Sequence, residues 1–142
     1  MNLVFDIETD GLDATKIWFI VAYDVDTHEV YAYGPDEISK KALNLLSKAD
    51  KLIGHNILGF DIPVIKKLYG IDLSGKQLVD TLVLSRLFNP VREGNHSLES
   101  WGYRLDSHKQ TKPEDFTVYT PAMLDYCKID VLLTAQLYTH LK

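Results

Sequence analysis

Residues 2–33 read NLVFDIETDGLDATKIWFIVAYDVDTHEVYAY, and this stretch decides the fold. Its apolar, β-branched and aromatic residues fall into three runs that are typical of strands, Asn2 to Ile7, Lys16 to Val25 and Glu29 to Tyr33. The short polar segment 26–28 between the last two runs favours a hairpin. We therefore expect three consecutive antiparallel strands at the start of the fold.

Helical and strand patterns follow this opening. Ile38 to Ala49 carries an apolar stripe at helical spacing, and Lys51 to Gly54 is a short apolar run that indicates a buried strand. A second helical pattern runs from Asp61 to Gly70, where the glycine marks its end. Two more helices are predicted over Asp80 to Phe88, with Asp80 as the cap, and over Ser97 to Leu105. A loop is predicted over Asp106 to Tyr119. Thr120 and Pro121 then open a last helix, which ends near His140.

Length and composition indicate one folded domain over residues 1–142. The chain has 46% hydrophobic and 25% charged residues, which is the balance of an ordinary globular domain. Because 15 Lys and Arg stand against 20 Asp and Glu, the charge argues against a protein that coats duplex nucleic acid electrostatically. It does not exclude a nucleic-acid enzyme, since divalent cations in an acidic site supply the positive charge that a polyanionic substrate needs.

The single cysteine, Cys127, rules out a disulfide within the chain and suits a reducing compartment. No signal peptide is visible, and no stretch approaches the roughly 18 apolar residues of a membrane-spanning helix. We therefore expect a cytoplasmic protein without a membrane partner.

Two acids stand close together on the first predicted strand. Asp6 and Glu8 are two residues apart, so their side chains point to the same face. Adjacent like charges on an apolar strand repel each other, and a hard divalent cation is the usual partner that makes the arrangement favourable. The pair therefore indicates a metal site, while two acids in water at a strand end, or a turn capped by Asp6, would leave the same pattern.

Two further segments carry acids that such a site needs. Residues 55–61, HNILGFD, lie between a predicted strand and a predicted helix, where binding sites are common. Asp61 either faces the same crevice as the first-strand acids or caps the helix that follows. On the last predicted helix, Tyr126 and Asp130 lie one turn apart on one face, so a phenol that orients a water and a metal-binding carboxylate can act together. A half-buried aromatic residue and a solvated charge would leave the same pattern.

Taken together, these segments resemble the three motifs of the DEDD 3′→5′ exonucleases, in order and on the expected elements. The matching segments are Phe5-Asp6-Ile7-Glu8-Thr9, Asn56-x-x-x-Phe60-Asp61 and Tyr126-x-x-x-Asp130. The third segment resembles that of the Tyr subgroup, since Asp125 stands where the His subgroup has its histidine.

Two more segments resemble the proofreading domain of family A DNA polymerases, and especially the replicative polymerases of short-tailed phages. They are Asp80 to Leu87 and His96 to Leu105, and the whole resemblance spans about Leu3 to Leu137. It implies an α/β, ribonuclease-H-like fold with a mixed central sheet, three antiparallel strands and then parallel additions, flanked by helices. It also implies a metal-dependent 3′→5′ exodeoxyribonuclease that removes nucleotides from single-stranded or frayed DNA 3′ ends by two-metal hydrolysis.

The resemblance implies roles for individual residues. The ligands for two divalent cations, Mg²⁺ or Mn²⁺, would be Asp6, Glu8, Asp61 and Asp130. Tyr126 would orient the attacking water, and the substrate-binding residues would be Thr9, Leu12, Asn56 and Phe60. A buried strand-end leucine is the structural alternative for Leu12, and a turn-forming residue is the alternative for Asn56.

Three questions stay open at this point. A 3′→5′ exoribonuclease of the same superfamily would have the same catalytic residues, because discrimination between the sugars rests on contacts to the 2′-hydroxyl. A non-catalytic nucleic-acid-binding module on the same fold is a further alternative, although intact acids at all four positions speak against it. The chain is either a free-standing enzyme or a proofreading domain that belongs to a DNA polymerase, and a phage-encoded protein would work in the bacterial host cytoplasm.

Overall fold

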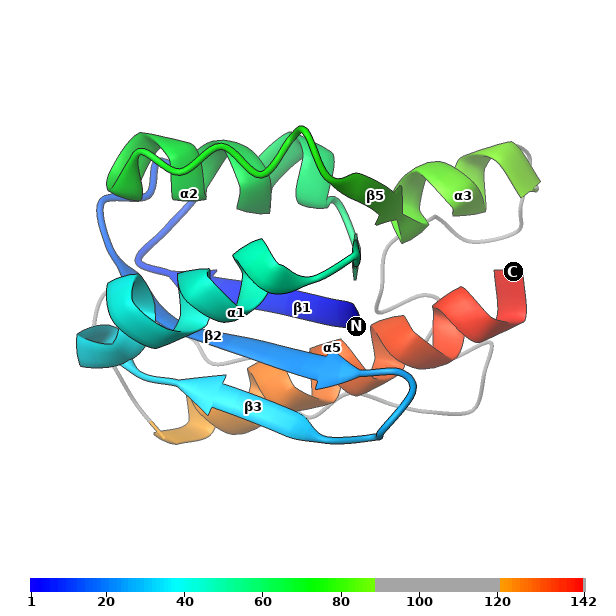
Figure 1. The fold of residues 1–142 in the computed structure, drawn as a ribbon, viewed down its shortest axis with the longest axis horizontal. Coiled ribbons are helices and arrows are strands. Elements are labelled where there is room, and N and C mark those ends of the chain that lie inside the picture. The colour runs from blue at the N-terminus through cyan, green and yellow to red at the C-terminus, as the bar shows by residue number, and fades with distance from the viewer. Residues whose placement is uncertain (89–120, 142) are drawn as a thin grey trace.

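Five strands form one mixed sheet in the order β3-β2-β1-β4-β5 in the computed structural model, which describes residues 1–88 and 121–141 (Figure 1). The pairs β1–β2 and β2–β3 are antiparallel, whereas β4 lies parallel to β1 and β5 lies parallel to β4. The strands are β1 (Asn2–Thr9), β2 (Ile17–Asp24), β3 (Val30–Tyr33), β4 (Lys51–Gly54) and β5 (Gln77–Asp80). Three antiparallel strands with parallel additions are the sheet that the sequence predicts.

The strand β5 is the element that the sequence pattern does not predict. It has only four residues, too few for a period to stand out, and the sequence pattern places Asp80 at the start of the following helix. That helix, α3, begins one residue later (Thr81–Phe88), and Asp80 Oδ1 accepts the backbone N–H of Leu82 at 2.9 Å. The start of the predicted helix is thus corrected by one residue, and the predicted cap is confirmed.

The α-helices agree with the predicted pattern, whereas the 3₁₀ helix η1 and the π-helix η3 lie where the sequence predicts no helix. Their bounds are η1 (3₁₀, Pro35–Glu37), η2 (π, Ile38–Ala42), α1 (Leu43–Lys48), η3 (π, Ile57–Asp61), α2 (Ile62–Tyr69), α3 (Thr81–Phe88) and α5 (Pro121–Leu141). The helix predicted over Ile38 to Ala49 therefore begins as π-helix, and the one predicted from Asp61 ends at Gly70 in left-handed backbone, with φ 72°. The predicted helix Ser97 to Leu105 and the predicted loop Asp106 to Tyr119 lie outside the described residues.

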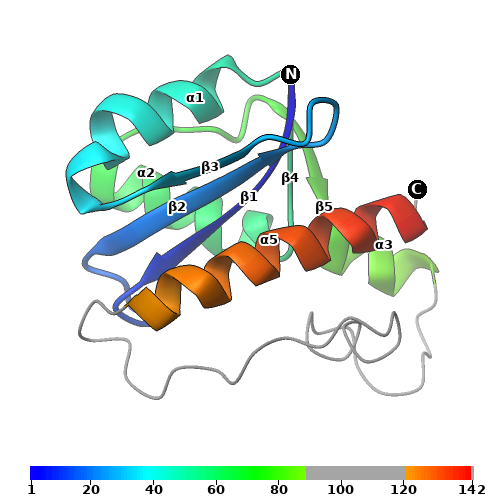
Figure 2. The ribbon, with the colours of Figure 1, turned by 90° about the horizontal axis from the view of Figure 1, so that it is seen from below.

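Helices cover both faces of the sheet (Figure 2). The helices α1 and α2 lie on one face, and α5 crosses the other. The core under α1 and α2 includes Phe5, Leu46 and Ile65, and the core under α5 includes Val4 and Cys127. Burial of such side chains contributes about 25 cal/mol per Å² of apolar surface and is the main force that holds the layers together. Among residues 1–88 and 121–141, no helix is long and apolar enough to cross a membrane.

The alternation of side chains along β1 determines where the site lies. Phe5 and Ile7 belong to the core under α1 and α2. Val4 belongs to the core under α5, so Asp6 and Glu8, at the same two-residue period, face α5 as well. The strand therefore buries its apolar residues and presents two carboxylates to the long C-terminal helix.

Candidate active site

Four carboxylates from three separate segments lie together near the carboxyl end of β1. Asp6 and Glu8 come from β1, Asp61 ends η3, and Asp130 lies near the middle of α5. Asp6 lies within electrostatic reach of the other three acids. The structure thus brings together the four acids that the sequence singles out, although they span more than a hundred positions of the chain.

A cavity of about 480 Å³ lies in front of these acids. Its walls come from the end of β1, the loop after β4 and one face of α5. All nine residues that the sequence predicts for catalysis or substrate binding line it, namely Asp6, Glu8, Thr9, Leu12, Asn56, Phe60, Asp61, Tyr126 and Asp130. Ile7, Gly11 and His55 complete the lining.

Asp61 is held toward β1 and not toward the helix that follows it. Its side chain is 3% exposed, and its Oδ2 accepts the backbone N–H of Ile7 at 3.2 Å. Within the described helix α2, no side-chain hydrogen bond from Asp61 caps the first turn. The interpretation of Asp61 as a helix cap is therefore wrong, and the bond to Ile7 fixes the carboxylate beside the acids of β1.

The loop after β4 turns sharply and so brings Asp61 to β1. Asn56 has left-handed backbone with φ 63°, which asparagine adopts more readily than most residues. A Cβ on Gly54 would lie 2.2 Å from Ile57 Cγ2, and one on Gly59 would lie 2.6 Å from Asn56 Oδ1. The turn-forming role of Asn56 is thus confirmed, and neither glycine accepts a side chain unless its neighbour moves.

The helix α5 carries Tyr126 and Asp130 on one face, as their spacing predicts. Both residues are largely buried, and both line the cavity. The helix therefore presents a phenol and a carboxylate to the same space as the acids of β1.

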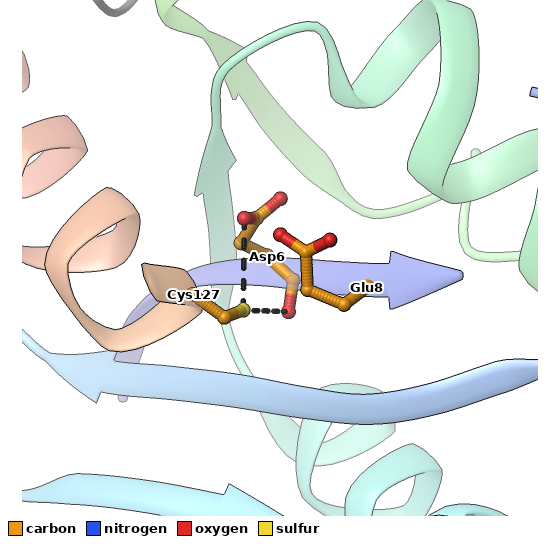
Figure 3. A group of neighbouring side chains, drawn as sticks. All are labelled: Asp6, Glu8 and Cys127. Carbon is orange, nitrogen blue, oxygen red and sulfur yellow. Dashed lines mark hydrogen bonds between the residues drawn. The ribbon is translucent and has the colours of Figure 1, made fainter. Parts of the chain in front are cut away.

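Cys127 also faces the acids of β1 (Figure 3), a placement that goes beyond the residues that the sequence predicts for the site. Its sulfur lies 3.6 Å from Asp6 Oδ2 and 3.8 Å from the Asp6 carbonyl oxygen, within reach of a weak S–H donor. Ligand atoms of Asp6, Glu8 and Cys127 all lie within 4.8 Å of one another. Burial, and then the charge of Asp6, raise the pKa of the thiol well above its usual range, so it stays a neutral donor. The spacing of three residues between Cys127 and Asp130 was the available signal, because it puts both on one helix face.

Thr9 and Leu12 form the rim of the cavity where β1 ends. Thr9 is buried, and its hydroxyl donates to the carbonyl oxygen of Gly11 at 2.8 Å, so it shapes the turn. Leu12 is 93% exposed. The interpretation of Leu12 as a buried strand-end leucine is therefore wrong, and an apolar side chain stands in solvent at the edge of the cavity.

Burial and crowding raise the pKa of two of the four acids. For Asp6 the loss of solvent is the largest cause, followed by the charges of Asp61, Asp130 and Glu8. For Asp61 burial again dominates, and it outweighs the opposing effect of the bond from the Ile7 N–H. Both pKa values lie well above the usual range for aspartate, so without cations these carboxylates bind protons more readily than aspartates in water do.

The metal-free protein is expected to lose stability as the pH rises through the range in which Asp6 titrates. Because folding raises the pKa of Asp6, the native state binds more protons than the unfolded state above about pH 4, the ordinary aspartate value. The unfavourable contribution of Asp6 to the stability of the folded state therefore grows as the pH rises from about 4 to the raised pKa. Asp6→Asn should flatten this loss and raise the melting temperature at neutral pH, measured by circular dichroism in chelator.

Asp10→Asn is the control with the opposite sign. Hydrogen bonds to Thr15, first from its side chain and then from its backbone N–H, lower the pKa of Asp10 to about 2. The stabilising contribution of Asp10 is therefore present at neutral pH and is lost as the pH falls toward that value. The melting temperature of each variant is compared with that of the parent from acid to neutral pH. If Asp6→Asn changes the melting temperature with pH in the same way as Asp10→Asn does, the crowding of charge around Asp6 is contradicted.

The donor set fits hard divalent cations. Four carboxylates offer oxygen ligands, which Mg²⁺ and Mn²⁺ prefer. Repulsion among them adds to burial in raising the pKa of Asp6, and a cation that takes the place of the proton relieves it. Asp6, Glu8, Asp61 and Asp130 are therefore a suitable ligand set for a divalent metal centre.

The sequence is similar to known proteins over most of its length. A model of the RNase H superfamily matches residues 3–107. The chain is 31% identical to a DNA-directed DNA polymerase of Escherichia phage T7, over 80% of this chain and 20% of the polymerase. The chain thus spans about a fifth of the length of this curated relative. The match itself confirms the predicted resemblance to phage DNA polymerases.

The fold is similar to that of solved structures. Brucella melitensis NrnC bound to pGG superposes with a TM-score of 0.78 at 23% identity, covering 99% of this chain and 71% of NrnC. Escherichia coli RNase D, an exoribonuclease involved in structured RNA processing, superposes with a TM-score of 0.70 at 16% identity, covering 99% and 38%. At these identities the likeness shows the fold, and with the match to the family it confirms the predicted ribonuclease-H-like class.

Proposed function

The chain belongs to the RNase H superfamily as an RNase H-like exonuclease domain, and we propose that it is a metal-dependent 3′→5′ exonuclease acting on single-stranded or frayed DNA ends. The observation that carries the proposal is the convergence of four carboxylates from three segments on one cavity. Buried like charges are unfavourable unless cations bind them, so the arrangement favours a metal-dependent function over a purely structural one.

The four acids, Asp6, Glu8, Asp61 and Asp130, would hold two divalent cations, Mg²⁺ or Mn²⁺. When bound, such cations lower the pKa of a water and stabilise the leaving 3′ oxygen of a phosphodiester. The chain then needs no nucleophile of its own. This agrees with the cavity, because the Cys127 thiol is buried and neutral and the Thr9 hydroxyl is bonded to the backbone.

Tyr126 is the residue that we expect to orient the attacking water. Its phenol stands one helical turn before Asp130 and lines the same cavity. A phenolic oxygen at this place can hydrogen-bond a water and direct it at the phosphorus, without ligating a metal itself. The role differs from that of the four acids, so substitutions can separate them.

The 3′ end of the strand would be bound by Thr9, Leu12, Asn56 and Phe60. Leu12 is suited to pack against the face of a terminal base, because it is apolar, exposed and placed at the rim of the cavity. A cavity of about 480 Å³ is of the size that holds one small ligand, which supports the end of a strand as its occupant.

Single-stranded and frayed 3′ ends should be degraded faster than blunt, matched duplex. Unpairing a terminal base costs a few kcal/mol, which corresponds to a rate on duplex slower by about 10²-fold. Gel analysis of labelled strands under single-turnover conditions measures the ratio, and a circular single strand is the control that should resist. Equal rates on duplex and single strand, or internal fragments from the circle, would contradict an enzyme specific for ends.

An exoribonuclease is the second candidate. The structural likeness to RNase D supports RNA as the substrate, whereas the sequence relationship to the phage T7 DNA polymerase supports DNA. We favour DNA because the sequence identity to the polymerase is 31%, against 16% for RNase D.

One assay tests the function and the choice of substrate together. DNA and RNA oligonucleotides of the same sequence, labelled at the 5′ end, are incubated with Mg²⁺, with Mn²⁺ and with chelator. We expect a ladder shortened from the 3′ end on DNA, and none in chelator. A faster ladder on RNA would favour the exoribonuclease, and no ladder on either strand would favour a non-catalytic binding module.

A DNA polymerase is the protein partner that we propose. In the phage T7 relative the matched region is part of a DNA polymerase chain, which supports a proofreading role. Adding this chain to an exonuclease-deficient polymerase should restore extension from a primer with a 3′ mismatch. Extension that stays blocked, with active exonuclease present, would argue against this role.

A further inference from the structure

We infer that Asp80 and Thr81, at the junction of β5 and α3, are positioning residues that set the place of Asp61 in the site. We call these two residues the β5–α3 anchor. The inference deepens the proposed function and rests on it, since Asp61 is one of the four acids assigned to the cations. The anchor itself does not line the cavity, so its hydrogen bonds act on the site through the loop that they hold. The charge of Asp80 also reaches Asp61 directly, as the last of the causes that raise the pKa of Asp61.

Asp80 is a buried carboxylate that the proposed reaction does not use. It is 5% exposed, and its Oδ1 accepts the backbone N–H of Asn56 at 2.8 Å while Oδ2 accepts that of Leu58 at 3.1 Å. Oδ1 also accepts the N–H of Leu82 at 2.9 Å as the cap of α3. One side chain therefore holds three backbone donors, and two of them belong to the loop that leads to Asp61.

Thr81 holds the start of the same loop. Its buried hydroxyl lies 2.8 Å from His55 Nδ1 and donates to the carbonyl oxygen of Gly54 at 3.4 Å. Gly54 and Asp80 are also paired directly across β4 and β5. The anchor thus contacts four of the five residues from 54 to 58, and His55 and Asn56 among them line the cavity.

The loop needs an outside support because its own backbone is unfavourable. Asn56 is in left-handed backbone, with φ 63°, and the next five residues form the π-helix η3, which ends at Asp61. Sparsely populated conformations of this kind persist where surrounding contacts hold them, and they are common at functional sites. Because Asp61 Oδ2 accepts the Ile7 N–H at 3.2 Å, a shift of the loop would move this carboxylate and lengthen that bond.

The variant Asp80→Ser separates the two roles of the side chain. A serine hydroxyl still caps α3, since serine is a good N-cap, but it is shorter and has one oxygen, so the amides of Asn56 and Leu58 lose their acceptor. We expect Mn²⁺ binding to weaken about 10- to 100-fold by calorimetry, as for other residues that orient a metal ligand. We also expect the amide resonance of Ile7 to shift, because this amide reports on Asp61 without any metal or substrate.

Asp24→Ser is the matched control. Asp24 is also a buried aspartate that accepts two backbone N–H groups, those of Asp26 and Thr27, at 2.9 and 3.3 Å. It lies opposite Leu3, at the other end of β1 from the site. Its substitution should lower the melting temperature and leave both the Mn²⁺ affinity and the Ile7 resonance at the values of the parent.

The outcomes separate this inference from the proposed function. Unchanged Mn²⁺ affinity and an unchanged Ile7 resonance in Asp80→Ser would overturn the inference. A parent protein that binds no Mn²⁺ would overturn the proposed function, while the Ile7 resonance would still decide on the anchor. If Asp80→Ser does not fold, Thr81→Val serves in its place, because valine keeps the shape of the side chain and removes the hydroxyl. It should give smaller changes in the same direction. An Ile7 resonance and a Mn²⁺ affinity equal to those of the parent would overturn the inference.

Discussion

Replacing both acids of β1 in one variant, Asp6→Ala with Glu8→Ala, is expected to reduce nuclease activity to that of the parent in chelator. These two carboxylates are half of the proposed ligand set. Cations in such a site supply several kcal/mol of transition-state stabilisation, and each 1.4 kcal/mol is about tenfold in rate, so the loss should be at least about 10³-fold. Single-turnover cleavage of a labelled single strand measures it.

The same double variant should keep its fold and melt at a higher temperature without metal. Burial, and then the charges of its neighbours, raise the pKa of Asp6, and removing two of four crowded acids removes much of this cost. Circular dichroism in chelator gives the comparison with the parent. Residual metal-dependent cleavage by the double variant, in a preparation free of other nucleases, would contradict the assignment of these acids to the metal site.

Tyr126→Phe is expected to slow the chemical step by about 10²- to 10⁴-fold if the hydroxyl carries the whole task of positioning the water. The ring keeps its buried place on α5, so the fold should not change. Metal affinity should stay near that of the parent, because the phenol is not one of the proposed ligands. Rapid-quench kinetics and a calorimetric titration with Mn²⁺ measure the two quantities separately.

Asp130→Asn is the matched comparison on the same face of α5. It removes a charged ligand and keeps the size of the side chain, so it should weaken Mn²⁺ binding as well as the rate. If Tyr126→Phe loses Mn²⁺ as badly as Asp130→Asn, or leaves the single-turnover rate unchanged, then Tyr126 is better interpreted as an aromatic residue of the core.

The parts of the fold that the sequence predicts are those in which local pattern and burial agree. The three opening strands and α5 follow from hydrophobic period, and the spacing of Asp6 and Glu8 places both on one face because strand side chains alternate. Asp61 and Asp130 are assigned to the same site as this pair by the resemblance to known motifs, because no local pattern relates acids that are so far apart in the chain.

The parts that the sequence does not predict depend on contacts between distant segments. The four residues of β5 become a strand because β4 offers them hydrogen bonds, and Asp61 turns from its helix because the amide of Ile7 needs an acceptor. Leu12 is exposed although apolar residues are usually buried, and nothing in its neighbours along the chain distinguishes it from a core leucine. The position of Cys127 three residues before Asp130 indicates a place beside the acids only once Asp130 is itself assigned to the site.

The position of α5 has a consequence for the way in which the protein is made. During synthesis on a ribosome, β1 and its two acids emerge before Tyr126 and Asp130 do. Until α5 docks, the nascent chain lacks both the cover over Val4, Phe19 and Ile53 and the last acid of the site. Completion of this part of the core and completion of the four-acid site are therefore one event, and a chain in which α5 has not docked lacks an assembled site.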